Sequence, residues 1–172
     1  MAVLEYRKAK TTYFDVEYDQ TGIKLLPCEY YVSLHKEMLA TVLGSCIAVC
    51  LFDPVLKIGG MNHYMLPGVP GQQEPIATRY AEPALSGLLD DLLSQGASLS
   101  RMTAKMFGGA QGFESMSTLR VGQQNIEYAR SFLVRHRIEC IAEDVGGTCA
   151  RRIVFFTGSG DVRLRRLSRR ST

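Results

Sequence analysis

The sequence predicts an α+β fold in which packed, mostly antiparallel β-sheets are flanked by two main helices. Short apolar segments bounded by Gly, Pro and Asp recur along most of the chain, which is typical of strands joined by tight turns. Only two segments carry apolar residues at helical spacing. Because strands outnumber helices and several are joined by short turns, antiparallel pairing should dominate.

The two helices are predicted from leucine-rich and mixed apolar stripes. The first covers residues 80–95 and is closed by Gly96, with a stripe formed by Leu85, Leu88, Leu89, Leu92 and Leu93. The second covers residues 121–136, with an inner face formed by Ile126, Ala129, Phe132 and Leu133. We expect both helices to form an outer layer on the sheets.

The strands are predicted from short apolar runs and the turn residues between them. Residues 47–52 are apolar throughout, which indicates a strand buried on both faces, and Cys140 is expected in another buried strand. The expected strands and hairpins are 12–26 (a hairpin around 19–22), 30–34, 39–43, 47–52, 58–66, 102–107, 139–142, 153–156 and 162–167, the last two joined around 158–161.

The length of 172 residues predicts a single domain spanning 1–172, with loosely ordered ends at 1–10 and 168–172. The charged fraction of 22% and hydrophobic fraction of 46% are ordinary for a globular protein. No apolar run approaches the roughly 18 residues of a membrane span, and the polar start lacks a signal-peptide pattern. The five cysteines are an odd number, which favours free thiols in a reducing compartment. These features predict a cytoplasmic protein that is not embedded in a membrane.

Basic residues are concentrated at the C-terminal end. The last 22 residues contain seven arginines and one acidic residue, Asp161, so the rest of the chain carries a net charge of about −3. Such a cluster could bind nucleic acid or an acidic protein surface. A solvated strand face is the favoured interpretation, because no aromatic platform or nucleic-acid motif accompanies the arginines. We therefore expect no nucleic-acid partner.

Cys46 and His63 are the residues best placed for chemistry. A thiol becomes a good nucleophile as thiolate, and a nearby imidazole can take its proton. Positions 46 and 63 are symmetric about a turn-forming segment at 53–56, so a hairpin centred there would place them opposite each other. Gly44 and Ser45 permit a tight turn that leaves backbone N–H groups near the sulfur, as an oxyanion hole requires.

Two other interpretations of these residues stay open at this point. A cysteine and a histidine in one chain are commonly a core thiol and a structural imidazole. Cys46, Cys50 and His63 could instead bind zinc, but two cysteines four apart on a strand are separated by about 13 Å. That distance is too long for one metal ion, which disfavours zinc.

Five segments of the chain form a distinctive set in a fixed order. They are Thr41-Val42-Leu43-Gly44-Ser45-Cys46-Ile47-Ala48-Val49-Cys50-Leu51-Phe52-Asp53-Pro54, Gly59-Gly60-Met61-Asn62-His63-Tyr64-Met65-Leu66-Pro67, Lys105-Met106-Phe107-Gly108-Gly109-Ala110, Ile141-Ala142-Glu143-Asp144-Val145-Gly146-Gly147 and Gly158-Ser159-Gly160-Asp161-Val162-Arg163. This set resembles the CheD family of chemoreceptor glutamine deamidases. The resemblance extends from about Tyr30 to Leu167.

The resemblance implies a protein-glutamine glutaminase that converts chemoreceptor glutamines to glutamate through a cysteine thioester and releases ammonia. It implies a fold similar to deamidating bacterial toxins, no metal or organic cofactor, and partners among chemoreceptor cytoplasmic domains and a CheC-type phosphatase. Some family members also hydrolyse receptor methyl esters. A non-catalytic adaptor that binds receptors or the phosphatase is the alternative.

The family site is completed by a threonine upstream of the cysteine. The resemblance implies that Thr41 takes this place, although a strand offset of one residue would turn its side chain away. The chain departs from the family in its last glycine-rich loop, where Thr148-Cys149-Ala150 precede Arg151 in place of a polar and a basic residue. This departure leaves the role of that loop undefined.

Overall fold

The computed structural model describes residues 4–111 and 116–168, with only the backbone described at 116–119. Its strands and helices, in chain order, are β1 (Arg7–Lys8), β2 (Thr11–Asp15), β3 (Gln20–Lys24), β4 (Glu29–Ser33), β5 (Met38–Leu43), β6 (Ile47–Asp53), β7 (Ile58–Asn62), the 3-10 helix η1 (Ala77–Arg79), α1 (Ala81–Ser94), β8 (Thr103–Gly108), α2 (Met116–Arg135), β9 (Glu139–Val145), β10 (Ala150–Phe156) and β11 (Asp161–Leu167). The α+β prediction is confirmed.

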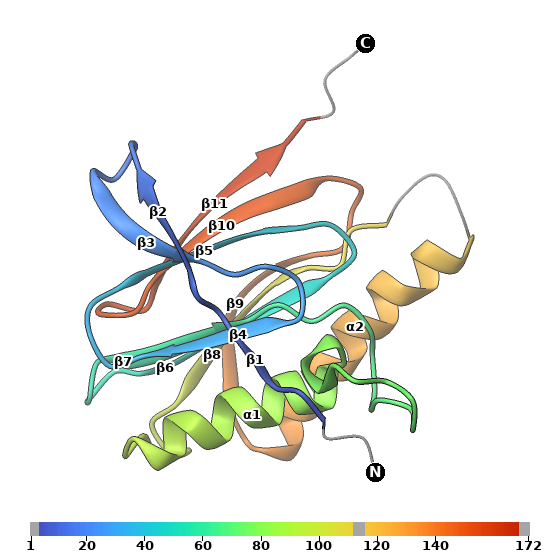
Figure 1. Cartoon of the computed structure of the whole chain (residues 1–172), viewed down its shortest axis with the longest axis horizontal. Helices are drawn as coiled ribbons and strands as arrows, with labels where there is room; N and C mark the ends of the chain where they lie inside the picture. Colours follow the sequence, from blue (N-terminus) through green and yellow to red (C-terminus); the bar gives the residue numbers. More distant parts are fainter. Residues whose placement is uncertain (1–3, 112–115, 169–172) are drawn as a thin grey trace.

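The strands form two mixed sheets that pack face to face. One sheet has the order β1-β4-β7-β6-β8-β9 and the other has the order β11-β10-β5-β3-β2. Six of the nine strand pairs are antiparallel, and β1·β4, β3·β5 and β8·β9 are parallel. Figure 1 shows the helices α1 and α2 below the six-stranded sheet and the five-stranded sheet above it.

Strand β6 separates two hydrophobic cores because its side chains alternate between the two faces. Ile47, Val49 and Leu51 pack with the helices, whereas Ala48 and Cys50 pack between the sheets. The core between the sheets also contains Leu39, Leu43, Ile153 and Phe155 from the five-stranded sheet. This arrangement explains the continuous apolar run at 47–52, which is buried on both faces as predicted.

Most predicted elements are present, with shifted ends. The hairpins 12–26 and 153–167, the strands at 30–34 and 39–43, and both helices are observed, and α2 begins five residues earlier than predicted. The segment 35–37 carries the chain from one sheet to the other, because β4 and β5 belong to different sheets. Residues 58–66 form a shorter strand, β7, and continue through an isolated pairing of Tyr64 with Ile47.

The expectation for Cys140 was wrong. Cys140 is exposed, because β9 is an edge strand whose first five residues face solvent. Residues 4–10 pair with neighbouring segments. Strand β1 pairs with β4, Glu5 forms backbone hydrogen bonds with Pro75 and Ala77, and Ala9 forms one with Tyr30. The remaining ends, 1–3 and 169–172, lie outside the described residues, so the prediction of loose order is untested there.

Candidate active site

The hairpin of β6 and β7 has a different register from the predicted one. Cys50 pairs with Met61, and Ile47 exchanges both backbone hydrogen bonds with Tyr64, at 3.1 and 3.0 Å. His63 is therefore opposite Ala48, and Cys46 is opposite Met65. The prediction that Cys46 and His63 face each other directly was wrong, because the turn is centred one position later than the sequence suggested.

The observed register still places Cys46 and His63 on one face of the sheet. They flank the Ile47–Tyr64 pair diagonally, and diagonal neighbours in such a ladder have Cα atoms about 7–8 Å apart. Ile47 and Tyr64 both lie in the core on the helix side. Cys46 packs against the core between the sheets, and the ring of His63 bonds a residue of the opposite sheet, so both point into that space.

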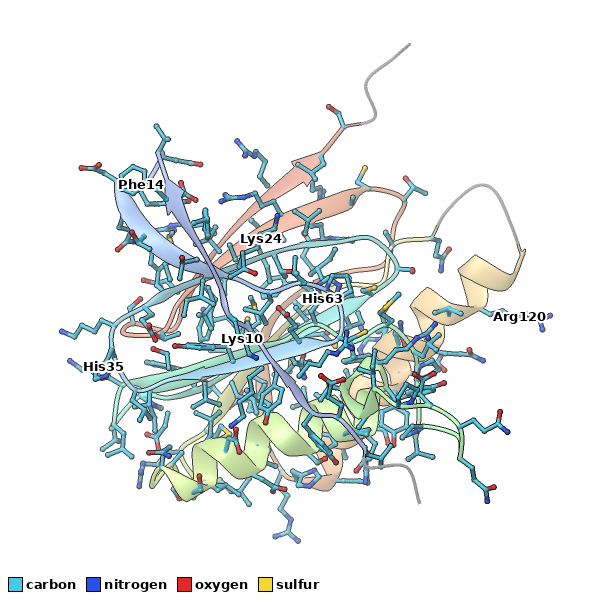
Figure 2. All side chains as sticks on the ribbon, viewed as in Figure 1. Lys10, Phe14, Lys24, His35, His63 and Arg120 are labelled. Atoms are coloured by element: carbon cyan, nitrogen blue, oxygen red, sulfur yellow. The ribbon has the colours of Figure 1, made fainter. Side chains whose placement is uncertain are left out.

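His63 is held by contacts to two other chain segments, one at residues 28–29 and one at Thr41. Its backbone N–H donates to Glu29 O at 2.9 Å, and its carbonyl accepts from Cys28 N at 2.8 Å. The ring nitrogen Nδ1 lies 2.7 Å from Thr41 Oγ1. His63 is 2% exposed, and Figure 2 shows it near the centre of the view, between the two sheets.

The contacts of Thr41 determine the tautomer of His63. The Thr41 hydroxyl also lies 2.8 Å from Leu25 O, which can only accept a hydrogen bond. The single hydroxyl proton is therefore donated to Leu25, and Thr41 Oγ1 accepts from the protonated Nδ1 of His63. This leaves Nε2 of the neutral ring with its lone pair, as a general base requires. Thr41 lies on β5 between Leu39 and Leu43, which also face the core between the sheets.

Burial keeps both groups neutral near pH 7. It raises the pKa of the Cys46 thiol to about 11, an effect to which the neighbouring Cys28 adds and which the Cys46 backbone N–H opposes. Burial lowers the pKa of His63 to about 4. Among the described residues no hydrogen bond joins Cys46 and His63. The resting pair is a thiol beside a neutral imidazole.

The backbone around Cys46 is bound by a second glycine-rich segment. Gly109 N donates to Cys46 O at 2.9 Å, and Ala110 N donates to Gly44 O at 2.8 Å. Gly108 has a φ of +110°, and a Cβ there would lie 2.1 Å from Cys46 O, so only glycine fits. This segment, described up to Gln111, therefore supports the cysteine loop through its backbone.

Gly44 and Ser45 lie in this loop, and each contributes a backbone carbonyl that another segment binds. A Cβ added at Gly44 would meet no atom within 4 Å, and the φ of Gly44 is not positive, so glycine is not sterically required there. Its contribution is a carbonyl that Ala110 N binds. Ser45 contributes a carbonyl that accepts from Asn125 Nδ2 at 3.2 Å.

Arg151 and Asp144 organise the neighbouring loop, and sequence reasoning did not single them out. The Arg151 side chain is almost fully buried, and its guanidinium donates to Asp144 Oδ1 at 2.6 Å, Gly146 O at 2.7 Å and Gly108 O at 3.3 Å. Burial raises the pKa of Asp144, but hydrogen bonds from Arg151 and Arg166 outweigh it and hold the pKa below its usual value. The available clue in the sequence was an arginine four residues after the pair Gly146-Gly147.

The zinc interpretation finds no supporting geometry. Among the residues with described side chains, no three His, Cys, Asp or Glu residues gather as a metal-binding group. Cys50 is fully buried opposite Met61 and Lys105, and burial raises its thiol pKa far above the usual value. Cys50 is therefore part of the core.

Comparison with known proteins assigns the chain to a family. The profile described as CheD chemotactic sensory transduction matches residues 65–166, more than half of the chain. A relative from Burkholderia thailandensis is 38% identical over 162 residues, which cover 92% of this chain and 69% of the relative. The chain belongs to the CheD family.

Other CheD relatives show the same level of similarity. Proteins from Burkholderia orbicola and Burkholderia mallei are 40% and 38% identical over 92% of this chain, which spans 66% and 69% of their lengths. Each of the three relatives is named a probable chemoreceptor glutamine deamidase CheD. No helix in the described ranges is long and apolar enough to span a membrane.

Proposed function

We propose that this chain deamidates glutamine side chains of chemoreceptors, with Cys46 as nucleophile and His63 as general base. The observation that carries the proposal is the hydrogen bond between Thr41 Oγ1 and His63 Nδ1 on the face that Cys46 shares. It orients a neutral imidazole whose Nε2 is available to the thiol. The names of the CheD relatives supply the substrate class.

The chemistry follows from these two groups. His63 Nε2 takes the Cys46 proton as the sulfur attacks the carboxamide carbon of glutamine, and a C–S bond forms. The protonated ring then gives its proton to the departing amine, which leaves as ammonia and creates a thioester. His63 next activates water, which releases glutamate and restores the thiol. Each proton that His63 takes is returned within the same half-reaction.

Because burial keeps both groups neutral, we expect the proton to pass from Cys46 to His63 only when substrate is bound. A thiol with a pKa of about 11 and an imidazole with a pKa of about 4 do not form an ion pair at rest. The Cys46 N–H, which already opposes the rise in thiol pKa, is our candidate donor to the oxyanion of the tetrahedral intermediate. Catalytic hydrogen bonds are commonly longer in a free enzyme than in its substrate complex. The proposal therefore includes closer approach of sulfur and ring on binding.

The proposed partners are the cytoplasmic domains of chemoreceptors, and the proposed compartment is the cytoplasm. A CheC-type phosphatase is a further proposed partner. We propose no nucleic-acid partner, because three arginines of the C-terminal cluster already have acidic partners: Arg151 and Arg166 pair with Asp144, and Arg152 pairs with Asp15. The basic surface is therefore smaller than the residue count implies.

Ammonia release and receptor binding, measured together, test the proposal. Purified protein is incubated with a chemoreceptor cytoplasmic fragment, released ammonia is quantified, and binding is followed by co-sedimentation. We expect ammonia from the wild type and none from Cys46→Ala, with binding retained by both. Binding without ammonia from the wild type would contradict the enzyme and support the adaptor alternative.

A further inference from the structure

Asn125 is a buried polar residue that contacts the segments on both sides of the proposed catalytic pair. It lies on α2 and is 0% exposed. Its Nδ2 donates to Ser45 O at 3.2 Å and to Met65 O at 2.9 Å. Ser45 immediately precedes Cys46, and Met65 follows His63 by two residues. One amide group therefore joins the cysteine loop to the segment that follows the histidine.

The chemistry of the contacts fixes the orientation of the Asn125 amide. Both partners are carbonyl oxygens, so the NH2 group must face them and Oδ1 must face away. No described residue donates to Oδ1. The Asn125 backbone is also bound, because its carbonyl accepts from the Tyr64 hydroxyl at 2.6 Å. A buried acceptor without a partner is costly, which indicates that the two donated hydrogen bonds serve a purpose.

Holding the Ser45 carbonyl also sets the direction of the Cys46 N–H. The peptide between Ser45 and Cys46 is planar and trans, so its C=O and N–H point in opposite directions. The Cys46 carbonyl is bound in turn by Gly109 N at 2.9 Å. The peptide groups on both sides of the sulfur are thus fixed, one by Asn125 and one by Gly109.

Close packing of α2 against the cysteine loop brings Asn125 within reach. A Cβ at Gly122 would lie 2.9 Å from Gly109 O and 3.1 Å from Ala110 O, so the helix approaches the backbone of this segment through a glycine. Ile126, four residues further along the helix, packs over Gly109. Asn125 lies between Gly122 and Ile126 on the helix, so the same packing places its side chain within hydrogen-bond distance of the Ser45 and Met65 carbonyls.

We propose that Asn125 is a positioning residue for the deamidation reaction. It orients the Ser45–Cys46 peptide so that the Cys46 N–H faces the reacting sulfur and the developing oxyanion, and it keeps this peptide aligned with the segment that carries His63. The inference rests on the proposed function of the site. It predicts an effect on the chemical step, not on substrate binding.

The test uses Asn125→Leu, which removes both donated hydrogen bonds at similar volume, and Asn125→Ser, which keeps one donor. Leu133→Ala is the matched control, because Leu133 is buried on the same helix and has an apolar side chain that forms no hydrogen bond to the site. The measurements are kcat and KM for receptor deamidation, thermal unfolding, and the pH dependence of Cys46 alkylation by iodoacetamide.

We expect kcat of Asn125→Leu to fall at least about tenfold, which is ~1.4 kcal/mol of barrier, with KM within about twofold of the wild type. The alkylation midpoint should shift to higher pH, and Asn125→Ser should lie between Asn125→Leu and the wild type. Leu133→Ala should lose stability while keeping the midpoint and kcat per folded molecule.

Two results would overturn the inference. One is an unchanged kcat and alkylation midpoint in Asn125→Leu, or in Asn125→Ser if the leucine variant does not fold. The other is an equal loss in Leu133→Ala at the same loss of thermal stability. If the wild-type protein deamidates no receptor, the proposed function fails, but the alkylation midpoint still decides whether Asn125 positions the thiol peptide.

Discussion

Thr41 Oγ1 lies 2.7 Å from His63 Nδ1, so a residue of the five-stranded sheet orients the ring of a residue that directly follows β7 of the six-stranded sheet. Thr41 is itself fixed by its hydrogen bond to Leu25 O. The relationship means that the base of the proposed pair is set by the packing of two sheets, and that its tautomer depends on one hydroxyl.

Replacing Thr41 should impair catalysis more than folding. Thr41→Val keeps the shape but removes the acceptor for the Nδ1 proton, so the ring can adopt the wrong tautomer. We expect kcat to fall about tenfold to a hundredfold, which corresponds to ~1.4–2.7 kcal/mol. Thr41→Ser keeps the hydroxyl and should retain most activity. Steady-state deamidation kinetics check this prediction, and equal activity of Thr41→Val and wild type would contradict it.

Activity should decline in acid because His63 must be neutral to accept the thiol proton. Burial lowers its pKa to about 4, so the free enzyme should keep a functional base well below the usual histidine pKa. We expect the acidic limb of kcat/KM to lie below pH 6, while alkylation of Cys46 should rise steadily into the alkaline range without an acidic plateau. An alkylation midpoint near or below pH 7 would show a thiolate–imidazolium pair and contradict the neutral resting pair.

The same shifts give a stability optimum between neutral and mildly alkaline pH. The pKa of His63 falls on folding from 6.5 to about 4, so the unfolded chain binds more protons in that window and stability decreases as pH falls through it. The pKa of Cys46 rises on folding from 9.0 to about 11, so stability decreases as pH rises through that window. Chemical denaturation at several pH values checks both slopes. In His63→Leu the loss between pH 6.5 and 4 should be smaller, and an unchanged slope would contradict the assignment.

Gly108 should tolerate no side chain, whereas Gly44 should. In Gly108→Ala the Cβ would lie 2.1 Å from Cys46 O at a positive φ, so the cysteine loop must shift. We expect a loss of about 2 kcal/mol or more in the free energy of unfolding and a large loss of activity. Gly44→Ala, which meets nothing within 4 Å, is the matched control and should keep both. Similar behaviour of the two variants in thermal unfolding and deamidation would refute this account of the loop.

Arg151 should contribute to stability through the loop that borders the site. Arg151→Met removes a buried guanidinium that binds Asp144 and the carbonyls of Gly108 and Gly146. We expect a loss of about 3 kcal/mol in the free energy of unfolding, because the Asp144 carboxylate and the two carbonyl oxygens would lose the hydrogen bonds of the guanidinium. Arg163→Ala is the control, because Arg163 has no ion pair among the described residues. Urea denaturation measures both, and equal stabilities would be inconsistent with this role.

The sequence predicted the fold class well because β6 and the two helices have strong patterns. The apolar run at 47–52 and the stripes of α1 and α2 reflect burial against neighbours on defined faces. The edge position of β9 was not predictable, since Cys140 and Ile141 give an apolar run whether or not a further strand covers them.

The sequence singled out Cys46, His63 and Thr41 as candidates, but it did not predict their geometry. The register of the hairpin depends on the turn that follows Asp53. The Asp53 carboxylate accepts hydrogen bonds from Val55 N and Leu56 N, and the last residue of the turn, Lys57, has a φ of +52°. No glycine marks that left-handed position, so the centre of the turn was placed one residue too early. Asn125 was missed because it is far from Cys46 in sequence and belongs to no motif.

The most direct test of the central claim is the mass of receptor glutamines after reaction in ordinary and ¹⁸O-labelled water. Attack by Cys46 and hydrolysis of the resulting thioester predict a gain of about 1 Da in ordinary water and about 3 Da in labelled water. Cys46→Ala and His63→Ala should give no gain. A wild-type protein that leaves every receptor glutamine unchanged, or a Cys46→Ala variant that converts them at the wild-type rate, would contradict the account.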